Sequence, residues 1–146
     1  MNRPGHIDSN IISTEILHYE LWNVCGLKIN QNFKPLYRGS ENEFSWKEFH
    51  TQCDNISPTL VIVKSADGCI FGGYTKTKWN CTSEYWVADS EAYLFRLQTA
   101  KIESKKYPVV NNKKAIYCGI FICYILWSGD LPIQCRYGML PTRSQN

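Results

Sequence analysis

Two apolar runs on either side of an Asp-Gly pair constrain the fold of this chain more than any other feature. The first run is Leu60-Val61-Ile62-Val63, and the second begins at Cys69-Ile70-Phe71. Asp67-Gly68 lies between them, and a glycine at this place adopts the positive φ of a tight turn at little cost. The sequence therefore predicts an antiparallel β-hairpin over residues 59–75. The continuous apolar run also indicates that the first strand is covered on both faces.

The adjacent glycines Gly72 and Gly73 interrupt the second strand, where glycine loses backbone entropy and offers no side chain for packing. A phosphate-binding loop also uses glycines, but it leads into a helix and carries a Gly-Lys-Ser/Thr order. Neither feature follows here. We therefore expect the two glycines to let bulky side chains such as Tyr74 and Trp79 pack against bare backbone, which makes their predicted role architectural.

Two segments in the N-terminal half have the periodicity of amphipathic helices. The first can be capped by Ser13 or Thr14, ends near Gly26, and carries these apolar residues: Ile12, Ile16, Leu17, Tyr19, Leu21 and Val24. The second begins after Ser45, which forms a capping box with Glu48 because the hydroxyl and the carboxylate each satisfy a free backbone amide. Its shared face consists of Trp46, Phe49, His50 and Cys53.

Further strands are predicted in the second half of the chain. Residues 91–99 alternate, with Tyr93, Phe95 and Leu97 on one face, and the apolar run 115–127 supplies one or two more strands. The lysine-rich segment 101–114 between them is expected to be a solvated loop, with contact to an acidic partner as the alternative. Because strands predominate and do not alternate with helices, the pattern favours an α+β or β-sandwich domain over alternating βαβ units.

The size and charge of the chain restrict the classes of function. A chain of 146 residues is long enough for one domain with a substantial core. Its net charge of +3 is too small for the concentrated basic face of a nucleic-acid-binding protein, so no nucleic-acid partner is expected. The longest apolar run, residues 115–127, is shorter than the roughly 20 residues that a membrane-spanning helix needs. No membrane span is therefore expected.

The cysteines indicate a reducing compartment. Seven are dispersed along the chain without a Cys-x-x-Cys pair, so the zinc-ribbon and thioredoxin spacings are absent. The first residues lack the apolar segment of a secretory signal. We therefore expect reduced thiols and a cytoplasmic location.

Cys53 and His50 are the first candidates for chemistry, because they share a helix face and a thiol needs a nearby base for activation. No oxyanion-hole element accompanies them, and a metal site would need further ligands. We favour local hydrogen bonding for His50 and an ion pair with a loop carboxylate for Arg38. Other carboxylates lie beside turns or helix ends, where they usually cap the backbone: Asp54, Asp67, Asp89, Glu91 and Asp130. No enzymatic activity, metal or cofactor is therefore predicted.

Several stretches of the sequence, taken in this order, resemble the TLDc family. They are KPLYRGS (34–40), FSWKEFHTQCDNISPTLVIVKSADGCIFGGYT (44–75), Trp79 and EAYLFRL (91–97), and the N-terminal SNIISTEILHYEL resembles the family's leading helix. The order of the pieces makes the resemblance specific. The residues at the family's signature positions are Arg38, Ser40, His50, Asp54, Gly72, Gly73 and Tyr74.

The resemblance implies a sandwich of antiparallel sheets with helices packed at its sides. It also implies a non-enzymatic protein-interaction module that is linked to protection against oxidative damage. The implied partner is the peripheral sector of the vacuolar proton pump, whose assembly several members of the family regulate. No catalytic mechanism belongs to the family, so the resemblance assigns no catalytic residue to this chain.

The chain also departs from the family pattern. Glu41-Asn42-Glu43 replaces an arg-asp-gly element, and the family's closing strands are not found after Ile133. We therefore predict three parts: a flexible tail at residues 1–8, a TLDc-like domain at 9–133 that is incomplete at its C-terminal end, and a polar tail at 134–146.

Two other functions stay open at this point. One is a thiol-based antioxidant or hydrolytic enzyme that uses Cys53 with His50, which the pKa of Cys53 would test. The other is a scaffold or ubiquitin-ligase-associated domain whose partner-binding part lies outside this chain, which a full-length transcript would test.

Overall fold

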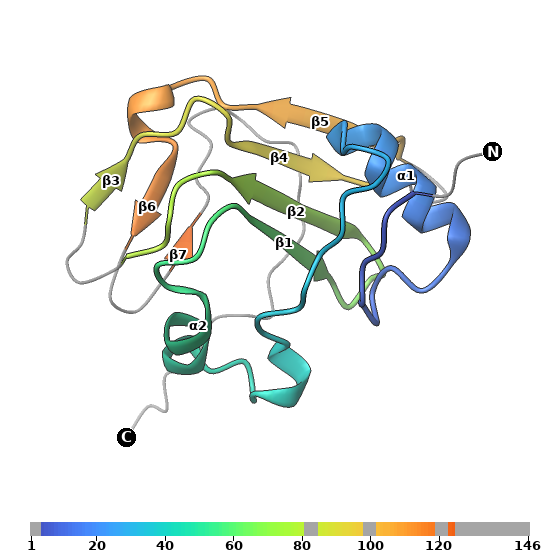
Figure 1. Ribbon diagram of the computed structural model, residues 1–146, viewed down its shortest axis with the longest axis horizontal. Helices are drawn as coiled ribbons and strands as arrows, with labels where there is room; N and C mark the ends of the chain where they lie inside the picture. The colour runs from blue at the N-terminus through green and yellow to red at the C-terminus, as the bar shows by residue number, and fades with distance from the viewer. Residues whose placement is uncertain (1–3, 81–84, 98–101, 119–122, 125–146) are drawn as a thin grey trace.

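The computed structural model describes residues 4–80, 85–97, 102–118 and 123–124. These residues form two α-helices, α1 (Glu15–Cys25) and α2 (Trp46–Cys53), and two antiparallel sheets (Figure 1). The larger sheet has the order β1-β2-β4-β5, with β1 at Thr59–Lys64, β2 at Ile70–Thr75, β4 at Tyr93–Arg96 and β5 at Lys105–Pro108. The smaller sheet has the order β3-β6-β7, with β3 at Tyr85–Val87, β6 at Ile116–Cys118 and β7 at Cys123–Tyr124. The predicted α+β class is confirmed, and the finer prediction of a sandwich is compatible with this arrangement.

The hairpin predicted from the Asp-Gly pair is present as β1 and β2. Its last ladder pair is Lys64 with Ile70. The amide of Gly68 donates to the carbonyl oxygen of Ser65 at 3.0 Å, and the amide of Ser65 donates to that of Cys69 at 2.9 Å. Gly68 has a φ of 87°. Residues 65–69 thus form the loop between the strands, a glycine closes its turn, and the loop fixes the register of the sheet's first two strands.

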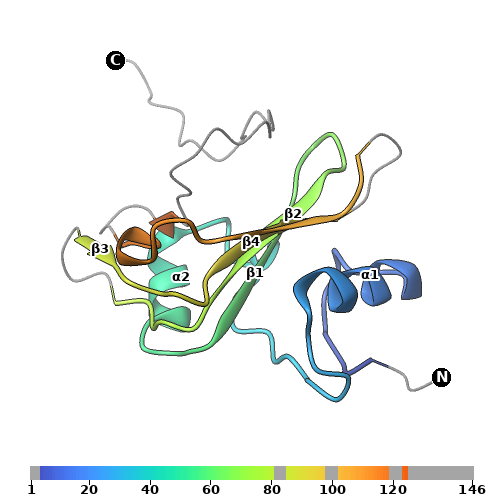
Figure 2. The same ribbon diagram turned by 90° about the horizontal axis from the view of Figure 1, so that it is seen from above.

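Two apolar clusters lie on opposite faces of the larger sheet. Leu60 and Ile62 of β1 pack against a cluster that α1 forms with β4, which we call the α1 core. Val61, which points to the other face, packs against a second cluster that includes Cys53 of α2 and Trp79, which we call the α2 core. Figures 1 and 2 show the two helices far apart along the sheet. The prediction that both faces of β1 are covered is therefore confirmed, although each of its apolar side chains is only half-buried.

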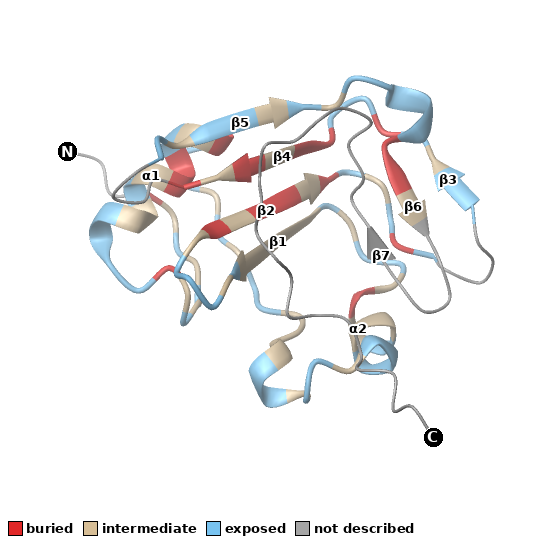
Figure 3. Cartoon of the chain, turned by 180° about the vertical axis from the view of Figure 1, so that it is seen from behind, coloured by how far each residue is buried: buried red, intermediate tan, exposed pale blue. Residues whose placement is uncertain are grey.

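Helix α1 begins and ends where the sequence predicts. Thr14 caps it by accepting a hydrogen bond from the amide of Leu17 at 3.2 Å, and Gly26 follows its last residue. Its buried side chains are Leu21, Trp22 and Cys25. The predicted apolar face is wrong at two positions, because Ile16 is 77% exposed and Tyr19 is also exposed. Figure 3 shows the buried side of α1 turned toward β4.

Helix α2 matches its prediction closely. The Ser45 hydroxyl accepts a hydrogen bond from the amide of Glu48 at 3.3 Å, which is the first half of the predicted capping box. The amide of Ser45 donates to the carbonyl oxygen of Asn42 at 2.9 Å in place of the predicted bond to the Glu48 carboxylate. Cys53 is buried, and the Phe49 ring packs against the α2 core and edge-on to Trp79, with centroids 5.9 Å apart. Trp46, at the start of the predicted apolar face, is half-exposed instead.

Residues 4–8 belong to the folded domain rather than to a flexible tail. Ile7 forms a parallel β-bridge with Phe33, and both side chains pack against the α1 core. The amide of His6 donates to the side-chain oxygen of Asn32 at 2.7 Å. The predicted boundary at residue 9 therefore lies too far along the chain.

The lysine-rich segment 101–114 is not a loop throughout, which corrects the prediction. It contains β5, a mostly exposed strand that pairs with β4 (Figure 3). Lys106 places its ammonium 4.0 Å from the centre of the Tyr93 ring and donates to the carbonyl oxygen of Cys25 at 3.2 Å. The aromatic ring and the helix end account for a lysine at this position of a strand.

The apolar run 115–127 supplies β6 and β7, as predicted. Among the described residues, no helix combines the length and the apolar character that crossing a bilayer demands. The predicted polar tail at 134–146 lies outside the described residues.

Candidate functional site

Gly72 has the architectural role predicted for it. A Cβ added to Gly72 would overlap the carbonyl oxygen of Val61 in β1 and would lie 2.8 Å from Cζ of the Phe95 ring in β4. The ring that needs the space is therefore that of Phe95, and not Tyr74 or Trp79 as predicted. Tyr74 instead stacks on Tyr93, with ring centroids 5.0 Å apart.

Gly73 is buried in the same strand, where it pairs with Val61 on one side and Leu94 on the other. The two glycines thus lie inside the sheet. They do not line an open cleft, which removes the phosphate-loop interpretation on structural grounds.

Arg38 fastens the N-terminal residues to the domain. Its guanidinium forms an ion pair with Asp8 at 2.7 Å and donates to the carbonyl oxygen of Asp8 at 3.1 Å. A second carboxylate, that of Glu41, lies 3.7 Å away. The predicted ion pair with a loop carboxylate is confirmed. Ser40 is exposed in the short 3-10 helix η1 (Gly39–Glu41).

His50, Cys53 and Asp54 lie together at the end of α2. Nδ1 of His50 lies 2.9 Å from a carboxylate oxygen of Asp54, which is the local hydrogen bond predicted for it. The Cys53 side chain is only 5% exposed. Burial, and then the charge of Asp54, raise the pKa of Cys53 to about 11. The thiol is therefore protonated at neutral pH, which disfavours a Cys53 nucleophile.

The state of Cys53 gives a direct prediction for thiol chemistry. With iodoacetamide at pH 7, Cys53 in the native protein should be alkylated at least about tenfold more slowly than in the urea-unfolded protein, because alkylation requires an accessible thiolate. Cys69, a free cysteine that is partly exposed, serves as the internal comparison. Peptide mass spectrometry after timed quenching resolves the two sites. Rapid alkylation of native Cys53 would contradict its protonated, buried state.

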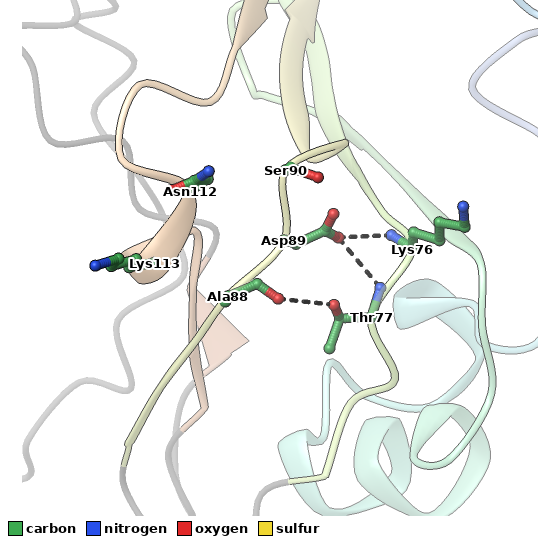
Figure 4. A pocket seen from close by; sticks show the side chains of 7 residues that line it. All are labelled: Lys76, Thr77, Ala88, Asp89, Ser90, Asn112 and Lys113. Carbon is green, nitrogen blue, oxygen red and sulfur yellow. Dashed lines mark hydrogen bonds between the residues drawn. The ribbon is translucent and has the colours of Figure 1, made fainter.

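A shallow pocket of about 410 Å³ opens beside Asp89. It is lined by Lys76, Thr77, Ala88, Asp89, Ser90, Asn112 and Lys113 (Figure 4). The Asp89 carboxylate accepts hydrogen bonds from the Thr75 hydroxyl at 2.7 Å and from the amides of Lys76, Thr77 and Glu91 at 2.7, 3.1 and 2.9 Å. Burial alone raises the pKa of Asp89, but these hydrogen bonds outweigh it and hold the pKa below its usual value. The Asp89 carboxylate thus accepts hydrogen bonds from backbone amides beside it, as predicted.

Asp89 should make the stability of the domain sensitive to acid. Because its folded-state pKa is depressed, its contribution is present above the unfolded pKa near 4 and is lost as the pH falls through the folded pKa. Asp89→Asn should therefore lower the free energy of unfolding by about 1–3 kcal/mol at pH 7 and by clearly less at pH 3. Urea unfolding of both proteins at the two pH values measures this difference. An equal loss at both values would contradict it.

One exposed aromatic surface was missed by the sequence reasoning. Phe44 and Trp46 flank the cap of α2 and are 60% and 46% exposed. In the surrounding sequence, ENEFSWKE at 41–48, the two aromatic residues are flanked by charged and polar residues. That polar setting is the signal that could have identified the surface, because an aromatic core residue is rarely surrounded by charges so closely in the sequence.

The sequence model of the TLDc domain matches residues 6–124. The chain belongs to the TLDc domain family. The match covers both helices and all the described strands, from the bridge at Ile7 to β7. Among curated proteins and among solved structures, no significant match was found.

The structure does not gather the signature residues of this TLDc domain into one site. Their partners are local or belong to the core: Asp8 and Glu41 for Arg38, Asp54 for His50, Phe95 for Gly72, and Tyr93 for Tyr74. Asp67 bonds the hydroxyl of Ser65 inside the hairpin loop, and Asp130 lies outside the described residues. Within the described ranges, no three His, Cys, Asp or Glu side chains form a group that could hold a metal ion.

Proposed function

We propose that this TLDc domain is a non-enzymatic protein-interaction module that acts in the cytoplasm. Its proposed partner is the peripheral sector of the vacuolar proton pump, in a role linked to oxidative-stress protection. Membership of the TLDc family carries this proposal. The partner and the role are those that the family resemblance implies.

The chemistry of the side chains supports interaction over catalysis. The thiol that would serve as nucleophile is buried and has a raised pKa. The carboxylate at the described pocket accepts four hydrogen bonds, one from the last residue of β2 and three from loop amides, so it is poorly placed to act as a base. Exposed aromatic side chains, by contrast, are typical of protein-binding surfaces.

Binding to the purified peripheral sector tests the proposal. The immobilised domain, confirmed as folded by circular dichroism, should retain the sector from solution, and the same domain unfolded in urea and then trapped by alkylation should not. Failure of the folded domain to bind would overturn the proposed partner.

A Cys53→Ser variant separates interaction from thiol chemistry. If binding to the sector is the function, this variant should protect peroxide-treated cells as well as the wild type does, provided that its melting temperature is unchanged. Loss of protection in a folded Cys53→Ser protein would instead favour the thiol-based alternative.

A further inference from the structure

The corner at which η1 meets α2, residues 41–48, presents two large aromatic side chains to solvent. Phe44 and Trp46 are separated in the sequence only by the cap residue Ser45, and both are more exposed than Trp79, the buried tryptophan of the α2 core. Tryptophan and other aromatic residues supply most binding energy at protein interfaces because they bury much area with few rotatable bonds. A pair of them on one corner therefore indicates a surface that is covered by a partner.

The corner is held in a fixed shape by hydrogen bonds of its own backbone. The amide of Phe44 donates to the carbonyl oxygen of Gly39 at 2.9 Å, and the amide of Ser45 donates to that of Asn42 at 2.9 Å. The Tyr37 hydroxyl donates to the carbonyl oxygen of Ser45 at 3.2 Å. The Phe44 ring lies directly over Gly39, where a Cβ would overlap it. A partner thus meets aromatic groups that are already positioned, which lowers the entropic cost of binding.

The charge around the two rings is negative. Glu41, Glu43 and Glu48 are all exposed, and Lys47 is the one basic side chain between residues 41 and 48. The Arg38 guanidinium lies 3.7 Å from Glu41 but is also paired with Asp8, so four carboxylates and two cations leave two negative charges on this surface. Such a surface repels nucleic-acid phosphates and anionic lipid headgroups and attracts lysine and arginine.

We propose that the η1–α2 corner docks a basic amphipathic polypeptide segment of a partner protein. In this complex the segment's apolar side chains cover Phe44 and Trp46, while its lysine or arginine side chains pair with the glutamates around them. This inference rests on the proposed interaction function and deepens it, because it assigns the binding to a surface and states the chemistry of the partner.

A designed peptide pair tests the chemistry without knowledge of the partner. The probes are a fluorescein-labelled Leu/Lys amphipathic helix and a Leu/Glu helix with the same pattern. In fluorescence anisotropy titrations the full chain should bind the Leu/Lys peptide at least about tenfold more tightly than the Leu/Glu peptide, and the preference should shrink as salt is added. Equal binding of both peptides would overturn the proposal.

Matched variants locate the binding on the molecule. Trp46→Ser and Glu43→Lys should each raise the dissociation constant for the Leu/Lys peptide, by about tenfold or more for Trp46→Ser. Their controls are Ile16→Ser, which removes an even more exposed apolar side chain from α1, and Glu103→Lys, which reverses an exposed charge before β5. The controls should bind as the wild type does. Equal losses in corner and control variants would overturn the assignment, as would corner variants that are folded and bind normally.

The same variants separate this inference from the proposed partner. If the wild type binds the peripheral sector of the proton pump and folded Trp46→Ser and Glu43→Lys bind it equally well, the corner is not the docking surface and the proposed function stands. If the wild type fails to bind the sector but binds the Leu/Lys peptide through the corner, the partner is wrong and the inference stands.

Discussion

Trp79→Ala should be the most damaging single substitution in the described part of this domain, lowering the free energy of unfolding by about 3–5 kcal/mol. The Trp79 side chain is 2% exposed, and its ring packs against Phe49 of α2. Its indole N–H donates to the hydroxyl of Thr59 at 2.9 Å, at the start of β1. Removal of the ring would leave a cavity between α2 and the sheet. It would also leave the Thr59 hydroxyl without the indole N–H that donates to it.

Trp86→Ala provides a matched control for this prediction, because Trp86 in β3 is 38% exposed. Trp86→Ala should lower the free energy of unfolding clearly less than Trp79→Ala does, since less apolar area returns to water. Urea denaturation followed by circular dichroism measures both variants. A Trp79→Ala protein as stable as Trp86→Ala would show that the α2 core does not depend on this ring.

Gly72→Ala should lower the free energy of unfolding by about 3 kcal/mol, although it adds a single methyl group. The methyl would overlap the carbonyl oxygen of Val61 and the Phe95 ring, and both lie in strands hydrogen-bonded to β2. The Val61 carbonyl can move only if the β1–β2 ladder shifts, and the Phe95 ring can move only if a fully buried side chain is displaced. Thermal unfolding should therefore report a melting temperature lower by about ten degrees or more.

Two comparisons isolate the cause of that loss. Gly68→Ala meets no atom within 4 Å, so it reports only the cost of a positive φ and should be milder, near 1 kcal/mol. The double variant Gly72→Ala/Phe95→Leu should be less destabilised than the sum of its parts, because the smaller side chain relieves one of the two overlaps. Full additivity would show that the Phe95 ring does not restrict Gly72.

The elements that sequence reasoning predicted well are those specified by neighbouring residues. The hairpin follows from Asp67-Gly68 and its flanking runs, and α2 follows from Ser45 and Glu48 at a fixed spacing. In both cases the decisive hydrogen bonds join residues within five positions of each other. The local sequence is therefore sufficient to predict both elements.

The errors occur where distant parts of the chain decide the outcome. Helix α1 has apolar residues on more than one side, and only the position of β4 determines that Leu21 and Trp22 are buried while Ile16 is exposed. The lysines of β5 suggested a loop because the Tyr93 ring and the end of α1, which accommodate Lys106, are far away in the sequence. The bridge between Ile7 and Phe33 gave no signal of its own.

The candidate site follows the same division. The local partner of His50 could be predicted, because Asp54 follows one helical turn later. For Arg38 a loop carboxylate could be predicted, but not that the closest one is Asp8, which lies 30 residues earlier in the chain. The ring that needs Gly72 could not, since Phe95 belongs to a strand that follows later in the chain. The exposed corner at Phe44 was missed because aromatic residues are usually assigned to the core.

The attachment of α1 has a consequence for how the protein is made. α1 leaves the ribosome before β4 and β5, yet its buried residues pack on β4, and two hydrogen bonds join it to the start of β5, from Ser104 just before the strand to Glu20 and from Lys106 to the carbonyl oxygen of Cys25. Phe33 can pack on Trp22 before those strands have been synthesised, but Tyr93, Phe95 and Leu97 of the α1 core are still missing. The nascent chain therefore exposes part of the apolar face of α1 until β4 and β5 follow, which favours binding by ribosome-associated chaperones.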